Sequence, residues 1–249
     1  MVAEFELRAF WGTKSTLVSS LLVQPVVYLV LLTGGVESLI DPAVTFAGGN
    51  YLSYVFPGLM ALQALREFSG AIYRTTAERR WGQLALKRLA GVGALGYVLG
   101  LTPPLIIAFL VQAVVSTPLA LLLGAHMTPQ GWLATILLGS VLLVFWAALA
   151  LLMTTLIRNY QQRDVVLGLL MLPLMFSAPV FFVLEDAPRY LQAIAWFNPL
   201  TYQVIAMRDA FNGELRWSIL AVALICTAVV VVVAAFSVSQ ADLLGSERG

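Results

Sequence analysis

The sequence predicts an all-α integral membrane protein with six transmembrane helices, and three observations support this fold class. The chain of 249 residues is 60% hydrophobic and 11% charged, whereas a typical soluble domain is about 25% charged. Long stretches of the chain carry almost no charge, and a span needs only ~20 apolar residues to cross the hydrocarbon of a bilayer. Basic residues gather in alternate loops between these stretches, as they do in multi-pass membrane proteins.

The six predicted spans belong to a single transmembrane domain that covers residues 1–249. Arg66 and Glu67 are the only charges that interrupt the second span, and a polar break at residues 124–130 separates the third from the fourth. We place the start of the third span near Leu101 because the following Thr102-Pro103-Pro104 resembles a helix opening. The predicted spans are residues 15–36, 51–73, 101–123, 131–156, 165–184 and 217–238.

The loop charges predict that both termini are cytoplasmic. With this orientation the outer loops hold only Arg189, Arg208 and Arg216, so the bias follows the positive-inside rule. We expect the plasma (inner) membrane of a prokaryote. The basic residues on the inner side are Arg8, Lys14, Arg74, Arg79, Arg80, Lys87, Arg88, Arg158, Arg163 and Arg248.

The remaining composition argues against several other function classes. A formal net charge of +1 gives no basic face for nucleic acid. The lone His126 has no Cys or second His near it, so no metal site is expected. The nearest string to a phosphate-binding loop, Gly12-Thr13-Lys14-Ser15, lacks the G-x-x-x-x-G-K-[ST] spacing. We therefore expect no catalytic, cofactor-binding or metal-binding residue, and no enzyme activity in this chain.

Two inner segments outside the spans are predicted to be amphipathic helices. Residues 2–11 fit a short interfacial helix on the inner leaflet. In the inner loop of residues 77–89, Leu84, Lys87 and Arg88 share one face, and Leu86 and Leu89 form an apolar stripe beside it. Such a helix either docks on a partner protein or binds anionic lipid headgroups, and spacing alone favours neither.

The outer segment of residues 185–216 is predicted to form two short helices that dip into the outer leaflet. The first covers residues 187–196 and the second residues 201–211, with a break at Asn198-Pro199. Asn198 is placed to cap the second helix, and Asn212-Gly213 is placed to end it.

The second span carries the main polar group inside the membrane. A charge within a span is costly and usually faces the bundle interior or a wet cavity. Gln63 lies three and four residues before Arg66 and Glu67, so it can bond to either of them. These three residues either hold spans or protomers together or line a substrate path.

Several local patterns, in this order along the chain, are similar to the ABC-2 type membrane permeases of ATP-binding-cassette exporters, near the drug-resistance and nodulation-factor export branch. The patterns are YLSYVFPG at residues 51–58, ERRWGQL at residues 78–84, and NPLTY at residues 198–202 followed by Arg208 and Asp209. The resemblance covers essentially the whole chain. It departs in two places: Gly91-Val92-Gly93 replaces a proline common in the family, and Leu101, not a basic residue, opens the predicted third span.

The resemblance implies a permease that pairs with a second permease, commonly an identical copy forming a homodimer, and with two cytoplasmic ATPase subunits that bind ATP and Mg. Residues 78–89 would be the coupling helix that docks on the ATPase. The implied ATPase-coupling residues are Glu78, Arg79, Arg80, Gly82, Leu84, Lys87 and Arg88, and the implied outer hairpin or gate residues are Asn198, Pro199, Tyr202, Arg208 and Asp209.

The expected function is outward movement of an amphipathic or lipid-like substrate, driven by ATP hydrolysis in the partner subunits. The alternative is a stand-alone ion-coupled carrier or a membrane-embedded scaffold. An ion-coupled carrier normally has acidic groups near the midplane and broken-helix repeats. Here Glu67 is the one acidic candidate and no inverted repeat is evident, so the carrier ranks second.

Overall fold

The computed structural model describes residues 26–31, 35, 46, 49–157 and 159–240. Residues 26–31 are helical. The predicted interfacial helix of residues 2–11 and most of the predicted first span lie outside the described residues. The chain from residue 51 onward forms helices joined by short connections, and this part positions every candidate site residue named above.

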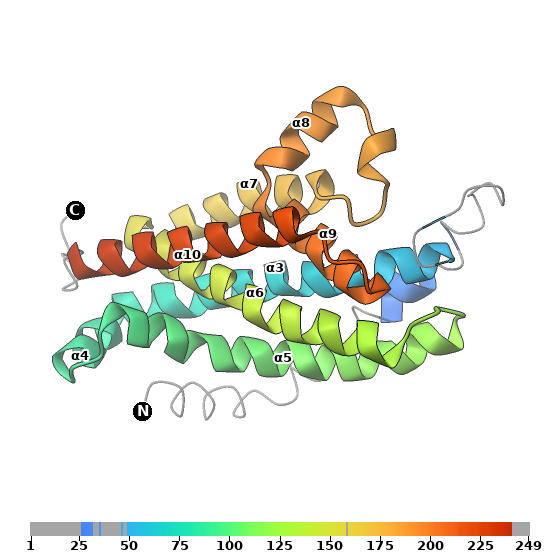
Figure 1. Cartoon of the computed structure of the whole chain (residues 1–249). Helices are drawn as coiled ribbons and strands as arrows, with labels where there is room; N and C mark the ends of the chain where they lie inside the picture. Colours follow the sequence, from blue (N-terminus) through green and yellow to red (C-terminus); the bar gives the residue numbers. More distant parts are fainter. Residues whose placement is uncertain (1–25, 32–34, 36–45, 47–48, 158, 241–249) are drawn as a thin grey trace.

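The described helices follow the order expected of a multi-pass α-helical membrane protein (Figure 1). They are α3 (Tyr51–Arg80), α4 (Gln83–Leu89), α5 (Ala94–Leu122), α6 (Pro129–Leu156), α7 (Tyr160–Ser177), the short 3₁₀ helix η3 (Leu184–Asp186), α8 (Arg189–Phe197), α9 (Pro199–Asn212) and α10 (Trp217–Gln240).

Helix α6 lies at the centre of the bundle. It packs against α3, α5, α9 and α10, and α3, α5, α6 and α10 run side by side along the long axis of the molecule (Figure 1). Trp146 of α6 is fully buried. Its ring lies 5.2 Å from that of Phe68 and 5.0 Å from that of Phe145, measured between centroids. Aromatic packing of this kind adds to the burial of apolar surface.

Three of the described helices are long and apolar enough to cross a membrane. They are α5, α6 and α10, with mean hydropathies of 2.3, 2.6 and 3.1 over their most apolar windows. Helices α3 and α7 coincide with the predicted second and fifth spans but are less apolar. Arg66 and Glu67 interrupt α3, and α7 begins with polar residues that include Arg163 and Asp164. The chain is therefore an integral membrane protein of α-helices, and the number of six spans stays a prediction.

The predicted helix start near Leu101 is wrong. Helix α5 begins at Ala94, with Gly93 as its extended N-cap, and it contains Pro103, Pro104 and Pro118. A proline inside a helix removes a backbone hydrogen bond, but membrane helices tolerate this when neighbouring helices pack around the site. Leu101 and Pro104 are indeed buried in the bundle.

Helix α7 ends earlier than the predicted fifth span, which reached residue 184. Its last residue is Ser177, and Ala178 is extended. A residue that precedes proline disfavours the α conformation, and Pro179 follows here. The chain then continues into η3 through residues 178–183, which we call the outer connector after the side predicted from the loop charges.

Candidate functional site

Residues 78–89, which we call the inner corner after the side predicted from the loop charges, are two helices and not the single helix predicted from the sequence. Glu78, Arg79 and Arg80 form the last turn of α3, and α4 starts only at Gln83. Gly82 separates the helices with a φ of 71°, a left-handed conformation that glycine adopts without the steric cost of a Cβ. The prediction of one continuous helix is therefore wrong, because Gly82 turns the chain.

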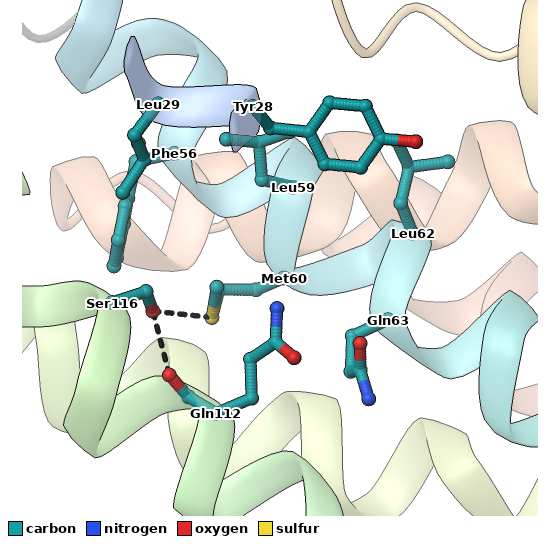
Figure 2. Close-up of a pocket in the computed structure, with 9 residues that line it drawn as sticks. All are labelled: Tyr28, Leu29, Phe56, Leu59, Met60, Leu62, Gln63, Gln112 and Ser116. Atoms are coloured by element: carbon teal, nitrogen blue, oxygen red, sulfur yellow. Dashed lines mark hydrogen bonds between the residues drawn. The ribbon is translucent and has the colours of Figure 1, made fainter. Parts of the chain in front are cut away.

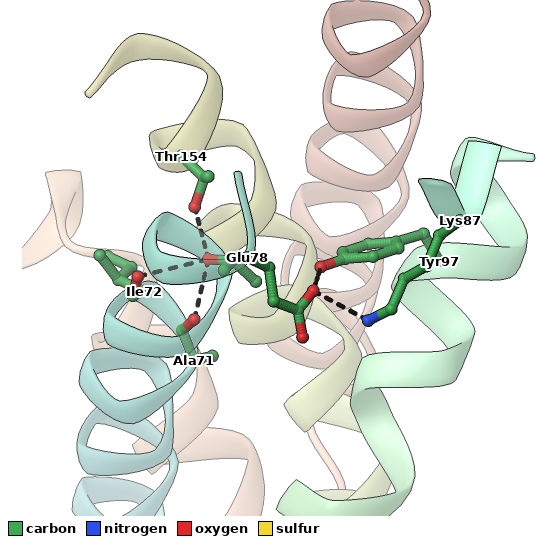
Figure 3. A network of polar contacts seen from close by, with 7 residues as sticks. Ala71, Ile72, Glu78, Lys87, Tyr97 and Thr154 are labelled. Carbon is green, nitrogen blue, oxygen red and sulfur yellow. Dashed lines mark hydrogen bonds and ion pairs between the residues drawn. The ribbon is translucent and has the colours of Figure 1, made fainter. Parts of the chain in front are cut away.

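A buried ion pair fixes α4 to α3 (Figure 3). Glu78 is 4% exposed. Its Oε2 accepts a hydrogen bond from Lys87 Nζ at 2.9 Å and a second one from the Tyr97 hydroxyl. The Lys87 ammonium also lies 5.1 Å from the centroid of the Tyr97 ring. These contacts join α3, α4 and α5 at the inner corner.

Two arginines of the inner corner bind the carboxyl ends of other helices. Arg79 Nη1 donates to the carbonyls of Thr154, Thr155 and Ile157 at 2.6, 3.1 and 3.1 Å, where α6 ends. Arg88 donates to the carbonyl of Val238 at 2.9 Å, near the end of α10. The last carbonyls of a helix lack intrahelical partners, and a cation near them is favourable.

Most of the candidate coupling residues are therefore engaged within the chain. Leu84 is 2% exposed. The side chains of this segment that face outward are largely apolar: Trp81 is 71% exposed, Leu86 64% and Leu89 85%. We call these three residues the apolar corner face. The leucines formed the apolar stripe of the predicted helix, whereas Trp81 was missed.

Gln63 bonds to Glu67 and not to Arg66. Its Nε2 donates to Glu67 Oε1 at 2.6 Å, one turn along α3. Gln63 is buried, and both charged residues are half-buried. Arg66 and Glu67 therefore differ in their surroundings. Glu67 pairs with Gln63, whereas Arg66 lies at a neighbouring position on the helix.

The outer hairpin of α8 and α9 has the break and the caps predicted from the sequence. Asn198 Oδ1 accepts from the backbone N–H of Leu200 at 2.9 Å, and Pro199 is the first residue of α9. The Asn198 Nδ2 also donates to the carbonyl of Leu174 at 2.7 Å, which ties the hairpin to α7. Gly213 ends α9 with a φ of 78°.

Arg208 and Asp209, neighbours in the sequence, have separate partners. Arg208 is 7% exposed. It donates to the carbonyls of Tyr54 at 3.0 Å and Pro179 at 2.8 Å, and its guanidinium lies 3.7 Å from the Tyr54 ring centroid. Asp209 instead accepts two hydrogen bonds from Arg216, at 2.8 and 2.9 Å, and this pairing raises the pKa of Arg216.

The remaining hairpin residue, Tyr202, joins the two helices of the hairpin. Its hydroxyl donates to the carbonyl of Trp196 at 2.9 Å, and the two rings lie 5.7 Å apart. Four of the five candidate hairpin residues, Asn198, Tyr202, Arg208 and Asp209, thus make contacts that hold the outer end together, and Pro199 begins α9.

The outer connector rests on the first turns of α3. The hydroxyls of Tyr51 and Tyr54 donate to the carbonyls of Phe181 and Phe182 at 3.1 and 2.9 Å. A Cβ added to Gly58 would lie 3.2 Å from the Cα of Val180, so a glycine permits this close approach. The sequence pattern of residues 51–58 carried the family resemblance, but its structural role as the seat of the connector was missed.

Two comparisons with known proteins identify the family. The family model described as ABC-2 type transporter matches residues 1–212. A protein of Cyanophora paradoxa named "Putative transport permease ycf38" is 24% identical over 199 residues, which are 79% of this chain and 68% of that protein. The family is one of transport components and not of catalytic subunits. By its sequence and by its helical membrane architecture, the chain belongs to the ABC-2 type transporter family and is a multi-pass transport permease.

Proposed function

We propose that the chain is the permease subunit of an ATP-driven exporter. Two copies of the chain would form a homodimer with six spans each and both termini in the cytoplasm of a prokaryote. Two cytoplasmic ATPase subunits would bind ATP and Mg and attach to the inner corner. ATP hydrolysis would then drive an amphipathic or lipid-like substrate outward across the plasma membrane.

The observation that carries this proposal is the construction of the inner corner. Exposed large apolar side chains close together in a short segment are typical of protein–protein contacts, and Trp81, Leu86 and Leu89 are all exposed within nine residues of the chain. The corner beneath them is cross-linked by the Glu78–Lys87 ion pair. A lipid headgroup site would instead leave the cations free, whereas Arg79 and Arg88 bind helix ends.

The same contacts give a route by which a partner's movement would reach the membrane. Force on α4 passes to α3 through Lys87 and Glu78 and to α5 through Tyr97. Arg88 carries it to the end of α10. We therefore expect α3, α5 and α10 to tilt together when the ATPase subunits close.

Within the same proposal, the polar group of α3 and the outer hairpin lie along the export route. Gln63, Arg66 and Glu67 would line the central path or the contact between two copies. The hairpin, through Asn198, Pro199, Tyr202, Arg208 and Asp209, would act as the outer gate. Its hydrogen bonds to α3 and the outer connector are the contacts that would break on opening.

Affinity purification from native membranes tests the proposal, with the copurified proteins identified by mass and assayed for ATP hydrolysis. We expect an ATP-hydrolysing partner that crosslinks to a Trp81→Cys variant and not to a Leu122→Cys variant. Leu122 is also an exposed apolar residue, 85% exposed, and it lies at the opposite end of α5. A chain that isolates without any nucleotide-binding partner, even after crosslinking, would overturn the proposal and favour an ion-coupled carrier or scaffold.

A further inference from the structure

A small polar cavity lies between α3, α5 and the helical residues 26–31 (Figure 2). Met60 and Gln63 line it from α3, and Gln112 and Ser116 line it from α5. Its interior offers about 10 Å³ to the centre of a water-sized sphere, and one water molecule needs roughly 10–15 Å³ measured in this way. The cavity therefore has room for about one water molecule.

Two buried carbonyl oxygens at this cavity lack a hydrogen-bond partner among the described residues. They are Oε1 of Gln63 and Oε1 of Gln112, on side chains that are 2% and 4% exposed. A buried acceptor without a partner costs about 1–3 kcal/mol, and such groups in proteins are usually satisfied by an ordered water. Figure 2 shows both carboxamides reaching the same space from opposite helices.

The orientation of the Gln63 amide follows from its neighbour. Glu67 Oε1 accepts from Gln63 Nε2 at 2.6 Å, so the amide nitrogen of Gln63 faces Glu67. The Gln63 carbonyl oxygen must therefore point away from Glu67, and the residue lines the cavity. A ligand that fits here must donate hydrogen bonds.

The two glutamines lie at the same depth of the bundle. At about 1.5 Å per residue, Gln63 lies ~18 Å from Tyr51 along α3, and Gln112 lies ~15 Å from Leu122 along α5. These helix ends meet at the outer side, where Asn50 Nδ2 donates to the carbonyl of Gly124 at 2.7 Å. The hydrocarbon of a bilayer is ~30 Å thick, so the cavity falls near its middle.

We propose that this cavity binds a water molecule that donates one hydrogen bond to Oε1 of Gln63 and the other to Oε1 of Gln112. The water completes a polar chain from Glu67 through Gln63 to α5, near the middle of the membrane. Through this water, Gln112, which no sequence pattern indicated, joins the same polar group as Gln63 and Glu67. This site is independent of the partner subunits and of the direction of transport.

X-ray radiolytic footprinting of the purified chain in lipid nanodiscs tests the site, because radiolysis of a bound water produces a hydroxyl radical that oxidises the nearest side chains. Met60 lines the cavity and is 1% exposed. Met207 is a matched internal control: it is 2% exposed, and its Cε lies against Gly139 in apolar packing. Both thioethers are open to oxidation to the sulfoxide. We expect Met60 to be oxidised several-fold faster than Met207.

Variants show whether the two glutamines hold the water. Gln63→Leu combined with Gln112→Leu removes both acceptors, and oxidation of Met60 should fall to the rate of Met207. Thr102→Val is the matched control, since Thr102 is a buried polar residue of α5 whose hydroxyl bonds to the carbonyl of Val98; it should leave Met60 oxidation unchanged. Equal rates for Met60 and Met207 in the unaltered chain would overturn the proposal, and so would fast Met60 oxidation that persists in the double variant.

Discussion

The inner corner and the outer end of this permease use arginine in opposite ways. At the inner corner, Arg79 and Arg88 bind carbonyls at the carboxyl ends of α6 and α10, and large apolar side chains are exposed beside them. At the outer end, Arg208 is buried and binds the carbonyls of Tyr54 and Pro179 between three segments. The inner arginines thus bind helix ends, whereas Arg208 connects three segments of the outer end.

The inner corner therefore offers a surface for contact, whereas the outer end holds its segments together through buried hydrogen bonds. Glu78, Arg79, Lys87 and Arg88 of the inner corner bond within the chain, so the surface beside the exposed Arg80 is mainly apolar and suits a protein partner. At the outer end, by contrast, the polar groups bind one another, and Asp209 with Arg216 forms the pair nearest to solvent. Substitutions at the two ends are therefore expected to differ in size and in kind.

Arg208→Met is expected to cause the largest loss of stability. It removes the charged donor that bonds to the carbonyls of Tyr54 and Pro179, and a hydrogen bond to a charged group is worth about 1.5–3 kcal/mol. We expect a loss of about 3 kcal/mol, measured as a lower midpoint of thermal unfolding in detergent. Arg208→Lys should recover part of the loss, because an ammonium keeps one of the two bonds. An unfolding midpoint for Arg208→Met equal to that of the unaltered chain would contradict the role of Arg208 in connecting these segments.

Lys87→Met tests the ion pair of the inner corner. It removes the Lys87 donor from the buried Glu78 carboxylate, which keeps its hydrogen bond from the Tyr97 hydroxyl (Figure 3), and a hydrogen bond to a charged group is worth about 1.5–3 kcal/mol. We expect the free energy of unfolding to fall by about 2 kcal/mol, measured as a lower midpoint of thermal unfolding in detergent.

The companion substitution Glu78→Gln makes the prediction sharper. Combined with Lys87→Met it should destabilise less than the sum of the two single changes, because the partners act as one unit. Strict additivity in this double-mutant cycle would show that Glu78 and Lys87 do not depend on each other.

Arg79→Gln and Arg88→Gln should have smaller effects than Arg208→Met. Each removes a cation from a helix carboxyl terminus at a partly exposed site, where such an interaction is worth about 0.3–1 kcal/mol. The matched control is Arg80→Gln, because the guanidinium of Arg80 contacts the ring of Tyr160 at 4.9 Å. If Arg79→Gln proves as harmful as Arg208→Met, the contrast between the two ends is lost.

The smallest expected effects come from removing single hydroxyls at the seat of the outer connector. Tyr51→Phe and Tyr54→Phe each lose one hydrogen bond to the connector, worth about 0.5–1.5 kcal/mol. Their aromatic packing is kept, so the unfolding midpoint should fall only slightly. A loss as large as that of Arg208→Met would show that the hydroxyls, and not the arginine, hold the connector.

Local chemistry predicted some of these features correctly. The break at Asn198-Pro199, the Asn198 cap and the end of α9 at Gly213 each depend on residues within a few positions, and the structure confirms them. The helices α6 and α10 also match the predicted apolar stretches closely. The start of α5 was missed because Pro103 and Pro104 resemble a helix opening but lie inside a packed helix.

The partners of the charged residues were not predictable from local sequence. A basic residue on an inner loop serves equally well for a lipid headgroup, a partner protein or a helix end of its own chain. Arg88 contacts Val238, and Arg208 contacts Tyr54, across more than half of the chain. Only the three-dimensional packing brings these groups together, and with Gln112 it also completes the polar cavity that the sequence did not indicate.

We propose that an ATPase partner contacts the apolar corner face and not the basic residues beside it. The most direct measurement compares retention of the ATPase subunit by two double variants, Leu86→Asp with Leu89→Asp and Arg79→Gln with Arg88→Gln, purified at a temperature where both are folded. We predict that the aspartate pair loses the partner while the glutamine pair keeps it. Loss of the partner from the glutamine pair with full retention by the aspartate pair would contradict the account.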